Sequence, residues 1–210
     1  MCEDAAGKDT EDERNKKWEM AFTARMRQIV RGLFLGNVKA SYDRDLLQKN
    51  RINTIVSFTD ARWVQCADSS TQDLLAYMSD ICDFIDRIAS PALSSLSSLP
   101  VNYKHATNYE SCGVPSDAIL IHCDLGISRS PTIVVAYLMR KLGMQKVDVL
   151  NFVQSRQKVK PSPNLTRQLQ VWEEVGYQVW ENEDKTVPKA PYKAFLEDRA
   201  DLLKKGADRE

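Results

Sequence analysis

The chain has 210 residues and equal numbers of basic and acidic side chains, 29 of each, so its formal net charge is zero. This length fits one domain with tails, and the balanced charge favours neither a nucleic acid nor an anionic membrane as a partner. Five cysteines without a CxxC pair and only two histidines give neither a disulfide framework nor a zinc site, so we expect no metal and no cofactor.

The chain begins with residues 1–24, which we expect to form a mobile tail because they are charged and show no clean apolar period. They lack the apolar segment of a signal peptide. The longest apolar run, residues 133–139, is far shorter than the roughly 20 residues that span a bilayer. We therefore expect an intracellular protein, cytoplasmic, nuclear or both, that makes no membrane contact.

Strand signals dominate the next segment. Residues 28–30 and 33–36 predict two short strands with Gly32 at the turn between them. Residues 41–50 predict a short helix, and residues 52–58, rich in β-branched side chains, predict a buried strand. Residues 63–66 are a candidate further strand.

Apolar residues between positions 74 and 88 recur at helical spacing. Ser70 or Thr71 is the expected N-cap of this helix, with Asp73 in its first turn. The following stretch, residues 89–117, is rich in Ser and Pro and keeps no period, so we expect a long loop insert. AILIH, residues 118–122, is almost wholly apolar, which is typical of a strand buried on both faces of a sheet.

Helical signals follow this strand. One helix is predicted from Pro131 to a stop at Gly143, and another over residues 147–156. After the rigid PSPN break, Asn164 is the predicted N-cap of a long helix over residues 164–180. Because strands alternate with helices, the sequence indicates the α/β class, with helices packed around a central sheet.

The C-terminal residues predict one more element after a polar linker. Residues 191–206 read as an amphipathic, charge-rich helix that we expect to be solvated at the surface. The chain thus divides into the tail (1–24), one folded domain (25–180) that contains the 89–117 insert, and the linker with the C-terminal helix (181–210).

AILIHCDLGISRSPT, residues 118–132, joins the buried strand to a helix through a tight turn. The peptide N–H groups of this turn can curl around one point, to which the helix start adds unpaired N–H groups and its positive dipole end. Gly126 permits a positive φ, and Arg129 presents a planar fork of donors that matches two phosphate oxygens. The candidate phosphate-binding residues are Asp124, Leu125, Gly126, Ile127, Ser128 and Arg129.

Cys123 lies at the mouth of this turn. Helix N-termini and cationic neighbours favour a thiolate over a thiol, so we expect an ionised nucleophile at neutral pH. Ser130 is placed to donate its hydroxyl to the sulfur, which helps the sulfur leave when a phosphorylated intermediate breaks down. The combination predicts covalent phosphoryl transfer. A reversible disulfide of Cys123 with Cys66 or Cys112 is the alternative to ordinary thiols at those two positions.

HCxxGxSRS followed by AYLM, residues 122–130 and 136–139, resembles the loop signature of cysteine-dependent dual-specificity phosphatases. The resemblance extends to GLFLGN, DSSTQDLLAYMSDICDFID and PSPNLTRQLQVW, and so covers most of residues 28–176. It implies a protein tyrosine phosphatase-like fold, with a central mixed, largely parallel sheet flanked by helices. It also implies that Cys123 is the nucleophile, Arg129 the phosphate clamp and Ser130 the thiolate partner.

The resemblance further implies a general acid on a loop that precedes the nucleophile's strand, and Asp68 matches that position, with Asp60 and Asp73 as alternatives. The connection before Asp68 is shorter than is usual in the family. By the same resemblance His122 tunes the thiolate and Asn164 braces the phosphate loop. An ordinary strand-end histidine and a simple N-cap are the alternatives for these two residues.

Three functions fit these residues. The first is an atypical dual-specificity phosphatase that acts on phosphotyrosine and phosphoserine/threonine in phosphoproteins through a cysteinyl-phosphate intermediate, with no kinase-docking module ahead of it. The second is the same chemistry on phosphoinositides, RNA 5′ ends or phosphoglucans, although Asp124 in the loop disfavours polyanions. The third is a non-catalytic phosphopeptide binder, which typically lacks the cysteine or the arginine. A phosphoprotein is the expected partner, and nucleic acid is not.

Overall fold

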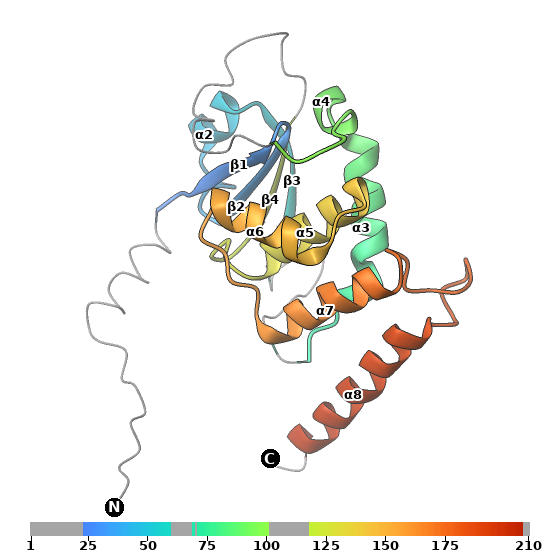
Figure 1. The fold of residues 1–210 in the computed structure, drawn as a ribbon. Coiled ribbons are helices and arrows are strands. Elements are labelled where there is room, and N and C mark those ends of the chain that lie inside the picture. The colour runs from blue at the N-terminus through green and yellow to red at the C-terminus, as the bar shows by residue number, and fades with distance from the viewer. Residues whose placement is uncertain (1–22, 60–68, 70, 101–117, 208–210) are drawn as a thin grey trace, which may run out of the picture.

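The computed structural model of the chain describes residues 23–59, 69, 71–100 and 118–207. Its centre is a sheet of four strands: β1 (Met26–Val30), β2 (Leu33–Asn37), β3 (Ile52–Phe58) and β4 (Ala118–Cys123), in the spatial order β1-β2-β4-β3. β2 and β3 both lie parallel to β4, whereas the edge strand β1 is antiparallel to β2. The sheet is mixed and largely parallel, which confirms the predicted fold class (Figure 1). The candidate strand over residues 63–66 lies outside the described residues.

Helices cover both faces of the sheet (Figure 1). One face carries α2, which packs against β3, and the other carries α5, with α3, α6 and α7 around it. The helices are α2 (Arg44–Lys49), α3 (Leu75–Ile88), α4 (Pro91–Ser94), α5 (Arg129–Leu142), α6 (Lys146–Arg156), α7 (Pro163–Glu174) and α8 (Ala190–Ala207).

β4 is buried on both faces, as its apolar sequence predicts. Ile119 and Ile121 point into the larger core, whereas Leu120 joins a smaller apolar cluster on the α2 side. Because successive side chains of a strand point to opposite faces, the strand packs against both apolar clusters. Its carboxyl end is therefore a rigid place from which to hold a reactive side chain.

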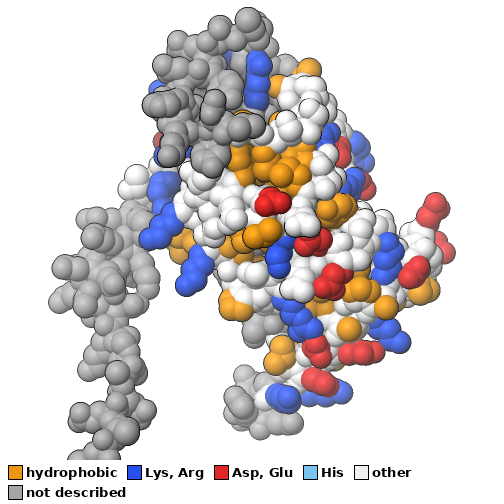
Figure 2. All heavy atoms as spheres, in the orientation of Figure 1, with side chains coloured by type: hydrophobic (Ala, Val, Ile, Leu, Met, Phe, Trp, Pro, Cys, Tyr) orange, Lys and Arg blue, Asp and Glu red, His pale blue; other side chains and the backbone are white. Residues whose placement is uncertain are grey.

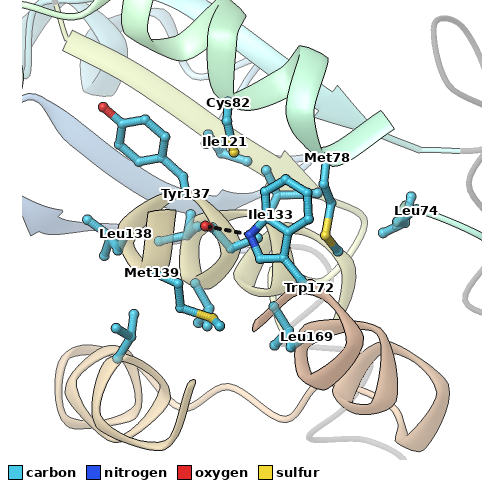
Figure 3. Close-up of a cluster of buried hydrophobic side chains, with 14 of the residues drawn as sticks. Leu74, Met78, Cys82, Ile121, Ile133, Tyr137, Leu138, Met139, Leu169 and Trp172 are labelled. Atoms are coloured by element: carbon cyan, nitrogen blue, oxygen red, sulfur yellow. Dashed lines mark hydrogen bonds between the residues drawn. The ribbon is translucent and has the colours of Figure 1, made fainter. Parts of the chain in front are cut away.

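α5 is the central helix of the larger core, and its residues from Arg129 to Met139 are all buried. Trp172 of α7 packs against it, and the indole N–H donates to the Ala136 carbonyl at 3.1 Å (Figure 3). α5 ends at Gly143, whose φ of 61° fits the predicted C-terminal stop. Because α5 is buried along this length, its first residue is fixed against the end of β4.

The start of α3 differs from the predicted one. The helix begins at Leu75, Thr71 does not cap it, and Ser70 lies outside the described residues. Asp73 precedes the helix instead of lying in its first turn, and its carboxylate accepts from the Leu75 N–H at 2.9 Å. The side-chain oxygen of Gln168 in α7 accepts from the same N–H at 3.2 Å. A side chain distant in sequence therefore takes part in a capping role that the local pattern assigned to a hydroxyl.

α7 also differs at both ends. Its N-cap is Ser162, whose hydroxyl accepts from a first-turn N–H at 3.5 Å, and not Asn164. Because the fixed φ of Pro163 suits the first helical position, the residue before the proline takes the cap. The helix ends at Glu174 and not at residue 180, and Tyr177 beyond it has a φ of 65°.

The described part of the predicted insert, residues 89–100, contains the short helix α4. Ser90 caps α4, accepting from the Leu93 N–H at 3.3 Å, and Leu93 is buried in the larger core. The serine–proline pair at the start of α4 acts as it does in α7. Residues 101–117 lie outside the described residues.

The C-terminal helix α8 is amphipathic, as predicted, but one side of its first half is buried instead of solvated. Tyr192 and Phe195 lie in the larger core. The Tyr192 hydroxyl donates to the Asp73 carboxylate at 2.8 Å, and Arg199 donates to the Thr71 carbonyl at 2.5 Å. α8 therefore binds the segment that leads into α3 as well as α7.

Tyr192→Phe is expected to lower the free energy of unfolding by about 1–3 kcal/mol, because the Asp73 carboxylate loses a donor in a partly buried position. Urea unfolding followed by tryptophan fluorescence measures this change. Tyr42→Phe is the matched control, since the Tyr42 side chain is 77% exposed, and it should leave stability unchanged. Equal stabilities for the two variants would contradict the role given to this hydrogen bond.

Surface charge is unevenly distributed on the face shown in Figure 2. Side chains of both signs alternate over α7 and α8, whereas Lys and Arg gather on the flank where the described chain begins (Figure 2). Within the described ranges, none of the helices combines the length and apolarity needed to span a bilayer.

Candidate active site at the end of β4

Most of the candidate residues meet where β4 ends and α5 begins. Cys123 is the last residue of β4, paired with Asn37 of β2 on one side and Phe58 of β3 on the other. Arg129 is the first residue of α5. The turn after β4 together with this first helical residue, residues 124–129, is called the 124–129 loop below.

The sulfur of Cys123 accepts two hydrogen bonds. The backbone N–H of Gly126 and the hydroxyl of Ser130 each donate to Sγ at 3.2 Å. The residue is 2% exposed, and Ser130 is fully buried. Both donors are suited to a negatively charged sulfur, because hydrogen bonds to an ionised acceptor are the stronger kind.

The carbonyl groups of the 124–129 loop point outward. Because the C=O of one residue and the N–H of the next point in opposite directions in a trans peptide, the N–H groups of residues 125–128 face the inside of the loop. A ring of N–H groups at a helix start suits an anion. The carbonyls of residues 124–127 accept hydrogen bonds of 2.8–3.3 Å from, in order, the Val38 N–H, the Arg25 guanidinium, the Gln157 side-chain amide and the Lys160 N–H.

Gly126 lies directly against β2. Its φ is 69°, and a Cβ at this position would lie 2.5 Å from the Gly36 carbonyl oxygen and 3.1 Å from the Asn37 nitrogen. Asn37 is fully buried, and its side-chain oxygen accepts from the N–H groups of Arg25 and Ala40 at 3.0 and 3.2 Å. The GLFLGN motif therefore supplies the close-packed backbone on which the loop rests.

Arg129 is 7% exposed, and its guanidinium donates to the Asp124 carboxylate across the loop. The Asp124 side chain is about half exposed. The ion pair holds the guanidinium at the loop, where its planar fork of N–H groups can address phosphate oxygens. It also places a negative charge at the rim.

The two supporting candidates have different surroundings. His122 is buried in β4, and burial lowers the pKa of its imidazole, so the ring is neutral at pH 7. Asn164 donates to the carbonyls of Ser69 and Gln72 at 2.9 and 2.8 Å, which fixes the segment before α3. The start of α7 contacts the 124–129 loop instead, because the N–H of its N-cap residue Ser162 donates to the Ser128 hydroxyl at 3.1 Å.

Of the three general-acid candidates, the structure describes Asp73 alone. Asp68 and Asp60 lie outside the described residues, as do Cys66 and Cys112. Asp73 is described, and both of its carboxylate oxygens are engaged, one by the start of α3 and the other by the Tyr192 hydroxyl. It is therefore poorly suited to exchange protons with a substrate.

Sequence reasoning missed five residues that hold the loop from outside. Four of them donate to its carbonyls although nothing in their local pattern marks them for this contact, namely Arg25, Val38, Gln157 and Lys160. Ser162 carried a signal, since serine before proline is typical of a helix N-cap. In the described residues no three His, Cys, Asp or Glu side chains are grouped to hold a metal ion.

This chain is similar to known proteins of one family. Residues 109–175 match the family described as "Dual specificity phosphatase, catalytic domain". The chain is 30% identical over 158 residues to Dual specificity protein phosphatase 1B of Arabidopsis thaliana, covering 70% of this chain and 80% of the relative. It is 31% identical over 151 residues to Dual specificity protein phosphatase 22 of Homo sapiens, covering 70% and 73%. The crystal structure of DUSP15 matches with 26% identity and a TM-score of 0.56, over 72% of this chain and 87% of that one.

Proposed function

Because this chain belongs to the dual specificity phosphatase family, as an atypical member within the protein tyrosine phosphatase superfamily, we propose that it hydrolyses phosphotyrosine and phosphoserine/threonine in phosphoproteins through a cysteinyl-phosphate intermediate. The observation that carries the proposal is the sulfur of Cys123, which accepts from the Gly126 N–H and the Ser130 hydroxyl beside the Arg129 guanidinium. Nucleophile, anion cradle and cation are thus supplied by residues 123–130.

The proposed reaction has two displacements at phosphorus. In the first, the Cys123 sulfur forms a bond to phosphorus while the ester P–O bond breaks, and the leaving oxygen takes a proton from a general acid. The inward N–H groups of the 124–129 loop and the Arg129 guanidinium stabilise the charge on the equatorial oxygens. In the second, water attacks phosphorus, the deprotonated general acid takes a proton from that water, and the S–P bond breaks. The Ser130 hydroxyl, 3.2 Å from the sulfur, stabilises the departing thiolate.

The general acid is proposed to be Asp68. Its sequence position is supported by the family resemblance, and the engagement of both Asp73 oxygens argues against that alternative. Asn164 and Gln168 of α7 fix the chain that follows Asp68, since they donate to the carbonyls of Ser69 and Gln72. α7 therefore holds the backbone of Ser69, the residue after Asp68.

Phosphoproteins are favoured over polyanionic small molecules because of Asp124. Its half-exposed carboxylate at the loop rim repels further phosphate groups that lie close to the scissile one. A singly phosphorylated side chain brings only the scissile phosphate into the loop, so the Asp124 carboxylate repels it less than it repels a substrate with several phosphates. The retained nucleophile and arginine also argue against a binding-only relative.

A substrate panel tests the proposed function. We expect hydrolysis of a phosphotyrosine peptide and of a phosphothreonine peptide, and a kcat/KM for a phosphatidylinositol phosphate at least about tenfold lower, because of the charge of Asp124. Phosphate release measured at equal ionic strength gives the three values. Hydrolysis of the phosphoinositide alone would replace the proposal with a lipid phosphatase, and tight peptide binding without turnover would replace it with a binding module.

A further inference from the structure

The Arg129 guanidinium already binds an anion that belongs to the chain itself. Its Nη2 group donates to a carboxylate oxygen of Asp124, the first residue of the 124–129 loop. Carboxylate oxygens and phosphate oxygens both bind the planar N–H fork of an arginine. The Asp124 carboxylate therefore occupies a donor that the phosphate oxygens of a substrate would otherwise use.

The two partners differ in their freedom to move. The Arg129 side chain is 9% exposed and lies at the start of the buried helix α5, whereas the Asp124 side chain is 46% exposed. The Asp124 backbone is fixed, because its carbonyl accepts from the Val38 N–H at 3.3 Å. The Asp124 side chain, however, can rotate into solvent from one rotamer to another. When an anion enters the loop, the carboxylate is therefore the partner that moves aside.

The charges show how this contact affects the binding of phosphate. A buried guanidinium is stable only beside an anion, and Asp124 supplies that anion within the loop. A phosphate group that enters must displace the carboxylate from Nη2 and then remain near it, where the two negative groups repel each other. Both steps weaken the binding of even a single phosphate group. This effect is separate from the repulsion of additional phosphate groups.

We propose that Asp124 is an internal competitor for the Arg129 guanidinium, and that it weakens the binding of the substrate phosphate and of the inorganic phosphate product alike. The proposal rests on the proposed function and adds to it a residue that sets the affinity of the site. Because substrate and product are affected in the same way, the carboxylate raises KM and reduces inhibition by the product. Uniform weakening of this kind leaves kcat nearly unaltered.

Asp124→Asn tests the competition, because the amide keeps an oxygen that can accept from Nη2 but carries no charge. We expect the KM for a phosphotyrosine peptide and the inhibition constant of inorganic phosphate each to fall about tenfold, with kcat changed by less than about threefold. Initial rates at constant ionic strength and several phosphate concentrations give all three values. If the ion pair only positions the guanidinium, both constants should rise and kcat should fall. That result, or unchanged constants, would overturn the proposal.

Two further variants isolate the charge and its place. Asp124→Glu keeps a negative charge on the loop, so both constants should stay closer to those of the unaltered chain than to those of Asp124→Asn. Asp184→Asn removes one charge from an exposed position between α7 and α8 and should leave both constants unchanged. An equal decrease in Asp184→Asn would show an effect of net charge alone and would refute a competition within the loop.

A binding measurement separates this proposal from the proposed function. Cys123→Ser, with and without Asp124→Asn, is titrated into a fluorescent phosphotyrosine peptide, and the dissociation constants are measured by fluorescence anisotropy. If the added Asp124→Asn change tightens binding about tenfold while the unaltered chain hydrolyses no peptide, the competition holds and the catalytic proposal fails. If the unaltered chain hydrolyses the peptide and the two dissociation constants are equal, the catalytic proposal stands and the competition is refuted.

Discussion

Cys123→Ser is expected to lower the turnover of a phosphotyrosine peptide by about 1,000-fold or more, because a serine hydroxyl at this position is a far weaker nucleophile than a thiolate. The structure gives the reason for so large a loss. Within the described residues the sulfur accepts from the Gly126 N–H and the Ser130 hydroxyl, and neither group is a base that could activate a hydroxyl in its place. The buried His122 ring does not serve as such a base, because His122 directly precedes Cys123 in β4 and successive side chains of a strand point to opposite faces.

Rapid acid quench gives the direct measurement. During turnover, the peptide that contains Cys123 should gain the mass of one phosphoryl group, and the serine variant should show no such intermediate. Cys82 is an internal control, because burial raises the pKa of its thiol to about 12 and keeps it protonated at neutral pH. Most of the activity surviving in Cys123→Ser, or phosphate found on a different cysteine, would refute the assigned nucleophile.

The sequence was sufficient to locate the 124–129 loop because each of its signals is local. An almost wholly apolar strand, a glycine with positive φ and a helix start follow one another within a few residues, and the structure places them as the pattern predicts. The outer support of the loop was not predictable in the same way. Arg25 and Gln157 lie 100 and 31 residues from the carbonyls they bind, and ordinary polar residues at such distances carry no signal of the contact.

Helix starts show the same limit. At α3 the capping acceptors are Asp73 and Gln168, and the latter is 93 residues away from the N–H that it binds. A local serine or threonine therefore looked like the better cap. At α7 the signal was present, since Pro163 fixes Ser162 as the cap, and Asn164 is free to bind the segment before α3.

The amphipathic pattern of α8 predicts only part of how this helix packs. The apolar positions of the sequence predict one buried face, but not the surface that covers it. In the structure the Tyr192 hydroxyl reaches Asp73, and the Arg167 guanidinium lies 5.5 Å over the Phe195 ring and pairs with Asp198. These contacts hold α8 against α7 and against the chain that leads into α3. α7 also binds Ser69, the residue that follows Asp68.

Gly126→Ala is expected to lower kcat/KM for a phosphotyrosine peptide by about 100-fold or more, because the loop must move off β2 to accept a methyl group. The new Cβ would lie 2.5 Å from the Gly36 carbonyl oxygen and 2.8 Å from its carbon, and both are backbone atoms that cannot turn aside. A displacement of about 1 Å in a catalytic group is enough for a loss of this order. The amide of residue 126 would then leave the Cys123 sulfur, which it reaches at 3.2 Å.

Gly143→Ala separates this collision from simple backbone strain. Gly143 has a φ of 61°, close to the 69° of Gly126, but a Cβ there would meet nothing within 4 Å. Both variants should lose about 1–2 kcal/mol of folding free energy from the left-handed conformation, measured by urea unfolding. Only Gly126→Ala should also lose activity and affinity for vanadate, a phosphate mimic. If the two variants retain equal activity, the close contact between the 124–129 loop and β2 does not position the N–H groups, and the origin of the anion cradle must be sought in α5 alone.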